Sequence, residues 1–116
     1  MNLNIEKLPE YTLIKVVDSK LDTNIAPDLK SELVVIAGSG ESNLVLDLSN
    51  CQYCDSSGLS AILVANRLCK NANGTFVLTG LTETVDQLVK LSQLDTVLNI
   101  AATPEEVKSF FQNPAV

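Results

Sequence analysis

The sequence contains no histidine, and this absence removes whole classes of catalytic and metal site. Nucleophilic systems of the Ser-His-Asp and Cys-His types need an imidazole as the base, and many metal centres need it as a ligand. Tryptophan is also absent and aromatic residues make up only 4% of the chain, whereas 46% of the residues are hydrophobic. We therefore expect an aliphatic core and a function that does not depend on histidine chemistry.

Basic residues are few: 8 Lys and Arg side chains stand against 14 Asp and Glu, which gives a formal net charge of -6. Proteins that bind nucleic acids or anionic membranes gather Lys and Arg on one surface, so this balance argues against both partners. No apolar run approaches the roughly 18 residues that span a bilayer, and the N-terminus lacks the pattern of a secretory signal. We expect a cytoplasmic protein that binds no membrane and no nucleic acid, and a protein partner with a basic face fits better.

The length of 116 residues predicts a single domain over residues 1–116. Short β-rich stretches alternate with segments of helical periodicity. The expected strands span residues 3–6, 11–17, 44–48, 75–78 and 96–100, and the expected helices begin near residues 24, 57, 82 and 103. Strands that alternate with helices predict an α/β fold in which parallel crossovers place helices over a central sheet. Ligands and chemistry in such folds lie beyond the carboxyl ends of the strands.

Capping residues mark the expected helix starts. Asn24 is a suitable cap for the first helix, with Pro27 in the first turn, where a proline ring is tolerated. Thr82 is placed to cap the third helix. Thr103 is followed by proline and then by Glu106 three residues after the cap, which is a strong start signal for the last helix.

The segment Asp55-Ser56-Ser57-Gly58-Leu59 follows an expected strand and opens an expected helix. A hydroxyl at a helix N-terminus faces outward N–H groups and a dipole that favours negative charge, so a phosphate on a serine fits there. The purely structural interpretation is that Ser56 or Ser57 caps the helix and that Asp55 shapes the loop as an Asx turn. Gly58 is expected to keep the backbone open where a kinase or partner approaches.

Three cysteines offer an alternative chemistry. Cys51 and Cys54 have the C-x-x-C spacing of redox and zinc sites. A zinc site needs a second pair of ligands, and only Cys69 remains. The structural interpretation is that Cys51 and Cys54 are small apolar residues at a buried strand end. A thiol redox protein that uses these two residues stays as the enzymatic alternative.

The helix after Gly58 carries apolar residues on more than one side. Leu59, Ile62, Leu63 and Cys69 share one side, and Ala61, Val64 and Leu68 fall largely on the other. A half-buried helix normally keeps its outer side polar. Two explanations are compatible with each other: this helix is wedged between neighbouring elements, and part of its surface next to Ser56 docks another protein.

Taken together, these features resemble the STAS domain family, and most closely its small single-domain anti-sigma factor antagonists. The segment Asp55 to Leu59 is similar to the family's phosphorylation loop, and its phosphoacceptor serine maps onto Ser56. Leu21-Asp22 resembles a Leu-Asp pair whose aspartate lies near the phosphoserine, and the run from Phe76 resembles the family's closing half. The implied fold is a mixed, mostly parallel sheet of four to five strands with about four helices.

The resemblance implies a regulator that switches between partners. In that family the unphosphorylated protein binds an anti-sigma factor that is also a serine kinase, phosphorylation releases it, and a PP2C-type phosphatase resets it. For this chain it implies phosphorylation at Ser56, a loop and partner surface of Asp22, Asp55, Ser57, Gly58 and Leu59, no cofactor, and no enzymatic activity of its own. Members of the family also serve as subunits of lipid-transport ABC complexes or as stress-sensing scaffolds, and these roles remain alternatives. Small-molecule binding at the loop is a further one.

Overall fold

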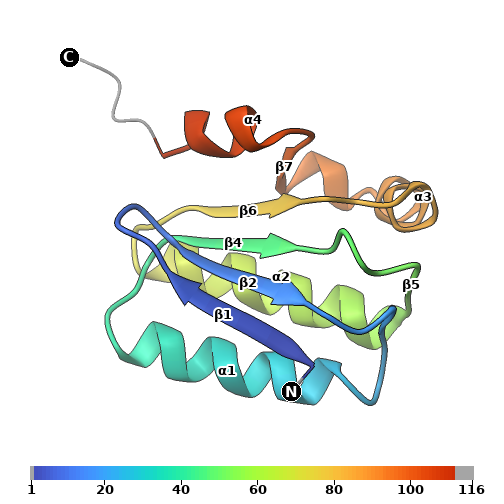
Figure 1. The fold of residues 1–116 in the computed structure, drawn as a ribbon, viewed down its shortest axis with the longest axis horizontal. Helices are drawn as coiled ribbons and strands as arrows, with labels where there is room; N and C mark the ends of the chain where they lie inside the picture. Colours follow the sequence, from blue (N-terminus) through green and yellow to red (C-terminus); the bar gives the residue numbers. More distant parts are fainter. Residues whose placement is uncertain (1, 112–116) are drawn as a thin grey trace.

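The computed structural model describes residues 2–111, which form a layered α/β fold (Figure 1). The main sheet has the strand order β1-β2-β4-β6-β7; β1 is antiparallel to β2 and the other pairs are parallel. Its strands are β1 (Leu3–Lys7), β2 (Thr12–Val16), β4 (Leu44–Asp47), β6 (Phe76–Thr79) and β7 (Asn99–Ala101). The helices are α1 (Ala26–Gly38), α2 (Ser56–Asn71), α3 (Glu83–Leu91) and α4 (Pro104–Ser109), with a 3-10 turn η1 (Leu94–Thr96). The mixed, mostly parallel sheet with helices over it confirms the predicted fold class.

The two faces of the sheet are covered unequally. Helices α1 and α2 lie side by side across one face, and α4 lies across the other (Figure 1). The first face carries the large aliphatic core, in which Ile14, Leu46 and Leu78 are almost fully buried. The second face carries a small cluster around Val45 and Val77 under α4. Because β4 and β6 are covered on both faces, their residues are apolar in succession instead of alternating.

Helix α1 begins differently from the prediction. Its N-cap residue is Ile25, whose side chain makes no capping bond, so the assignment of Asn24 as the cap is wrong. Asp22 supplies the polar contacts instead: its Oδ1 accepts from the Asn24 N–H at 3.0 Å, and its carbonyl accepts from the N–H groups of Ile25 and Ala26. Pro27 falls in the first turn as predicted.

The carboxyl-terminal part departs from the prediction in two places. The strand expected over residues 96–100 is shorter and later, because η1 occupies its first part and β7 covers only Asn99–Ala101. Thr82 is the N-cap residue of α3 as predicted, but its hydroxyl donates to the carbonyl of Cys51 at 2.7 Å and makes no capping bond. The cap at Thr103 is confirmed, since its Oγ1 accepts from the Glu106 N–H at 3.2 Å.

The apolar excess of α2 has a structural explanation. This helix packs against α1 and β6. Ala61, on the supposed outer side, is fully buried, and Val64 and Leu68 pack against the core. The wedged arrangement is therefore confirmed for these residues, whereas Leu63 is only half-buried.

Candidate functional site

A small second sheet lies where β2 and β4 end, at the carboxyl edge of the main sheet (Figure 1). Its strands β3 (Lys20–Leu21) and β5 (Tyr53–Cys54) are parallel, with Leu21 opposite Cys54. The backbone N–H of Asp55 continues the ladder by donating to the Leu21 carbonyl at 3.3 Å. Asp22 and Asp55, which follow these paired residues, are therefore neighbours, and this juxtaposition gives the site its shape.

The two aspartates hold two helix starts in place. Asp55 is the N-cap of α2, and its Oδ1 accepts from the Gly58 N–H at 3.0 Å. Asp22 closes the turn that leads into α1, as described above. Both carboxylates are half-buried. The site thus has two carboxylates fixed by backbone contacts beside the N-terminus of one long helix, α2.

Ser56 is the first residue of α2 and is exposed, whereas Ser57 is half-buried. Neither serine is the helix cap, because that position belongs to Asp55. The interpretation of Ser56 or Ser57 as a cap is therefore wrong, and the Asp55 carboxylate does this work through an Asx-type contact. The Ser56 side chain is left at the surface beside the paired aspartates.

Gly58 has a reason to be glycine that the sequence did not reveal. It is buried, and a Cβ at this position would overlap the carbonyl oxygen of Leu21 and stand 2.6 Å from the Cys54 Sγ and 2.9 Å from the Leu21 Cγ. The expected reason, an open backbone for an approaching partner, is wrong. Gly58 instead lets α2 approach the β3–β5 pair closely.

Two exposed side chains beside the loop were not found by sequence reasoning. Tyr53 is 47% exposed, and Lys20 lies opposite it on β3 and is also exposed. Their neighbours in the same strands, Leu21 and Cys54, are buried, so the two residues of each strand alternate between surface and core. Two-residue strands carry too little periodicity to be recognised. Leu59, on the first turn of α2, packs partly against the core.

The cysteines near the site are buried and in the free form. Burial, assisted by Asp18, raises the pKa of Cys51 to about 11, and burial, assisted by Asp55, raises the pKa of Cys54 to about 12. Because the thiolate is the reactive form, both thiols are unreactive at neutral pH. Within residues 2–111, no group of three or more His, Cys, Asp or Glu side chains is arranged to hold a metal ion.

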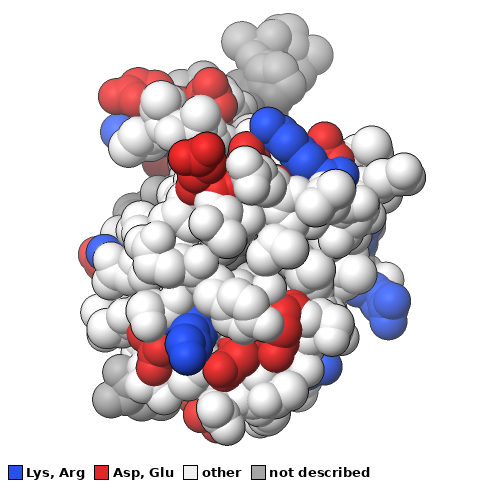
Figure 2. Space-filling model, turned by 90° about the vertical axis from the view of Figure 1, so that its right-hand side faces the viewer, with Lys and Arg blue, Asp and Glu red and all other residues white. Residues whose placement is uncertain are grey.

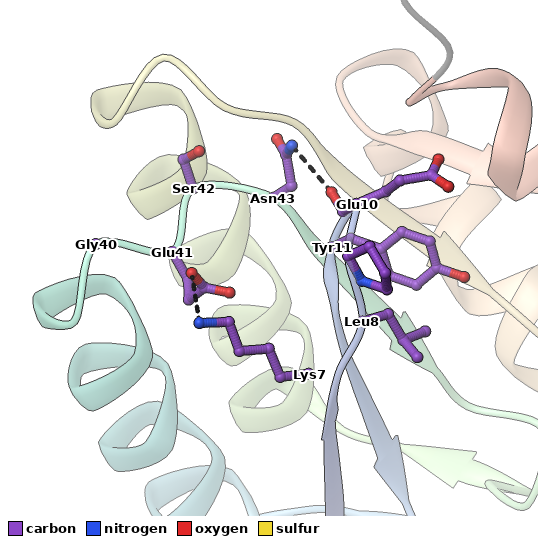
Figure 3. Close-up of a pocket in the computed structure, with 9 residues that line it drawn as sticks. Lys7, Leu8, Glu10, Tyr11, Gly40, Glu41, Ser42 and Asn43 are labelled. Atoms are coloured by element: carbon purple, nitrogen blue, oxygen red, sulfur yellow. Dashed lines mark hydrogen bonds and ion pairs between the residues drawn. The ribbon is translucent and has the colours of Figure 1, made fainter.

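The carboxyl edge presents a broad uncharged surface on which acidic and basic side chains are interspersed (Figure 2). A hollow of about 400 Å³ lies on this edge between α3 and the ends of β6 and β7, and Glu83 and Asp86 line it. A second depression lies at the opposite edge, where Lys7 and Glu41 pair at 3.6 Å and the Asn43 amide donates to the Glu10 carbonyl (Figure 3). In the part of the chain that the structure describes, no helix has the length and apolarity to cross a bilayer.

Chemically, the carboxyl edge combines an exposed hydroxyl, a helix N-terminus and two fixed carboxylates. The residue that carries this hydroxyl, Ser56, is exposed at the surface.

Known proteins resemble this chain over nearly its whole length. A family model described as the STAS domain matches residues 2–107. The anti-sigma-B factor antagonist of Bacillus subtilis is 28% identical over 106 residues, which cover 90% of this chain and 96% of that protein. The anti-sigma-B factor antagonist of Staphylococcus epidermidis is 26% identical over 101 residues, which cover 86% of this chain and 94% of that protein.

Solved structures show the same fold. An anti-sigma factor antagonist from Mycobacterium paratuberculosis superposes with a TM-score of 0.83 at 18% identity, covering 96% of this chain and 93% of that one. The Bacillus cell fate determinant SpoIIAA in its phosphorylated form gives a TM-score of 0.72 at 17% identity, covering 92% and 97%. At these identities the likeness concerns the fold alone.

Proposed function

Because this chain belongs to the STAS domain family, we propose that it is an anti-sigma factor antagonist, which binds an anti-sigma factor when unphosphorylated and releases it when phosphorylated on Ser56. The names of the relatives from Bacillus and Staphylococcus support this assignment. The anti-sigma factor is the serine kinase of the pair, and a PP2C-type phosphatase removes the phosphate. The protein is a binding partner and a substrate in the cytoplasm, and it catalyses no reaction itself.

The observation that carries the proposal is the position of Ser56. It is exposed on the first turn of α2, and the β3–β5 pair brings Asp22 and Asp55 next to it. The partner surface consists of these residues with Ser57, Gly58 and Leu59. Among them Gly58 acts by allowing the close packing described above.

Phosphorylation acts in this proposal by charge and leaves the fold intact. A phosphoserine adds about -1.5 to -2 charges at pH 7, and the helix N-terminus offsets only about 0.3–1 kcal/mol of the cost at an exposed position. The Asp55 carboxylate already accepts a hydrogen bond from the Gly58 N–H. It therefore offsets part of the positive charge at the N-terminus of α2, and less of that charge is left to stabilise a phosphate. A partner packed on this loop would face like charges, which cost several kcal/mol, and each ~1.4 kcal/mol is tenfold in affinity.

Two alternatives keep the same fold. A subunit of a lipid-transport ABC complex or a stress-sensing scaffold would use the loop surface without a phosphorylation cycle. The thiol redox alternative is disfavoured by the structure, because Cys51 and Cys54 are buried and their pKa values are raised.

The proposal is tested by intact-mass spectrometry of the purified chain incubated with ATP and a lysate of its source organism. We expect one added phosphate that is lost in Ser56→Ala and kept in the matched variant Ser57→Ala. The unmodified and phosphorylated forms are then compared in binding to the anti-sigma factor of that organism. A phosphate that persists in Ser56→Ala, or equal binding by both forms, would reject the mechanism.

If no phosphate is added although the lysate kinases are active, the scaffold alternatives gain support. Copurification with a transporter ATPase would then favour the ABC complex. Replacing both Cys51 and Cys54 with serine tests the redox alternative, and retained partner binding would leave it without support.

A further inference from the structure

Strand β1 is an edge strand of the main sheet. In every second residue of this strand, the backbone N–H and C=O groups point away from β2. The Val17 N–H donates to the Asn2 carbonyl at 2.8 Å, and the Leu8 N–H donates to the Tyr11 carbonyl at 2.9 Å. The backbone N–H and C=O groups of the even-numbered residues therefore point toward β2. In an antiparallel ladder the intervening residues direct their N–H and C=O groups to the other side, so those of Leu3, Ile5 and Lys7 face the open edge.

These outward groups match those of a second copy. In an antiparallel pairing about a two-fold axis through Ile5, Ile5 faces Ile5 of the other copy, and Leu3 faces Lys7. Each outward N–H then meets an outward C=O. On the opposite face of the sheet Asn4 stands across from Glu6, an amide–carboxylate pair, and no like charges face one another directly.

Charge complementarity supports the same register. A hollow of about 120 Å³ lies between Leu3 and α1, and the carboxylates of Asp28 and Glu32 line it. Lys7 of the second copy would stand opposite Leu3, next to this hollow. Within its own copy the Lys7 side chain is 75% exposed, and among residues 2–111 its ion-pair partner is Glu41 at 3.6 Å, so it can exchange partners at little cost.

Apolar side chains continue the surface along α1. Asp28, Glu32 and Val35 follow one another at helical spacing and so share one flank of the helix, the flank whose first members line the hollow beside Leu3. Val35 is 66% exposed and Ile5 is 40% exposed. A two-fold axis through Ile5 brings both copies of this flank to the same side of the joined sheet.

We propose that this protein forms a symmetric homodimer through β1, in which the two main sheets join into one continuous sheet and Lys7 of each copy reaches Asp28 and Glu32 of the other. Charged residues on an edge strand, such as Lys7, normally discourage such pairing. In the proposed dimer, Lys7 has acidic partners in the other copy, Asp28 and Glu32. The charge therefore favours the register in which Leu3 faces Lys7. Strand β1 contributes no residue to the proposed phosphorylation loop, although its Leu3 end and Asp28, in the first turn of α1, lie toward the same edge of the sheet as Asp22.

Sedimentation velocity of the full chain, from low micromolar to millimolar concentration, tests the dimer. The wild type should pass from monomer to dimer, whereas Ile5→Pro should remain monomeric. The proline removes only an outward N–H and no bond to β2, and proline is tolerated on edge strands; circular dichroism and thermal unfolding check its fold. A wild type that stays monomeric throughout, or a dimer that survives Ile5→Pro, would overturn the proposal.

A charge exchange tests the register. Lys7→Glu should weaken association at least ~tenfold, because like charges then face each other at two symmetric places. Adding Asp28→Lys and Glu32→Lys to Lys7→Glu should restore it. Lys7 and the hollow lined by Asp28 lie at opposite ends of β1. The exchanged charges can therefore meet only between two copies, and a restored association cannot come from a contact within one copy. The matched variant Glu41→Gln, which removes only the internal ion pair, should dimerise like the wild type; failure of the rescue would overturn the assigned register.

Discussion

Replacing Gly58 with alanine measures how much the site depends on close packing between α2 and the β3–β5 pair. The added methyl group would overlap the Leu21 carbonyl oxygen and lie 2.6 Å from the Cys54 Sγ. The first obstacle is backbone, and the second is a buried side chain, so neither moves aside freely. Helix α2 must instead shift away from β3, and Ser56, two residues earlier on the same helix, must shift with it.

The magnitude follows from two opposing terms. Overpacking a filled site costs about 1–3 kcal/mol, while alanine in a helix is favoured over glycine by about 0.8–1 kcal/mol. The expected net loss in the free energy of unfolding is about 0–2 kcal/mol, and the protein should remain folded, since domains of this size have about 5–15 kcal/mol of stability.

Urea unfolding followed by circular dichroism supplies the measurement, and Gly38→Ala supplies the matched control. Gly38 also lies in a helix, but nothing stands within 4 Å of a Cβ built there. That variant should be as stable as the wild type or gain up to ~1 kcal/mol. If Gly58→Ala behaves like Gly38→Ala, the close approach of α2 to Leu21 does not constrain this position and the packing argument is refuted.

Further predictions concern the contacts around the loop. Asp55→Ala should lower the free energy of unfolding by about 1 kcal/mol through loss of the cap, whereas Asp55→Asn, which keeps an acceptor for the Gly58 N–H, should stay close to the wild type in the same assay. Thr82→Val should cost about 1 kcal/mol because it removes the hydroxyl bonded to the Cys51 carbonyl; a neutral result would mean that this bond does not tie α3 to the loop. Because the folded-state pKa values of Cys51 and Cys54 are raised from 9.0 to about 11 and about 12, their contribution to stability is complete below pH 9 and is lost as the pH rises to those values. Thermal unfolding should show a loss above pH 9 that is smaller when both cysteines are replaced with alanine.

Sequence reasoning reached the main sheet and the helices because those elements carry periodic apolar patterns. The buried residues of β2 alternate, and Leu29, Leu33 and Ile36 of α1 recur at helical spacing. The site was harder to predict. Ser56 was found because a strand and a helix flank it, but Asp22 entered only through the family resemblance, since nothing local links it to a loop far along the chain.

The remaining errors have physical causes. The β3–β5 pair was missed because each strand has two residues, and the cap of α2 was misassigned because Asp55, Ser56 and Ser57 are all good capping residues in adjacent positions. The role of Gly58 depends on Leu21, which belongs to a distant segment. Local patterns therefore fix elements, whereas the contacts that shape this site are long-range.

The pairing of Leu21 with Cys54 also determines at which stage of folding the surface around Ser56 forms. It closes a loop of about thirty residues, and the entropy of that closure is recovered only after the intervening helix and strand have folded. A chain still emerging from the ribosome, or one that has lost its core, contains the serine and both aspartates in sequence but does not bring them together. An enzyme that recognises the assembled surface would therefore phosphorylate folded chains and not unfolded ones. The phosphorylated fraction would then depend on how much of the protein is folded as well as on the activity of the kinase.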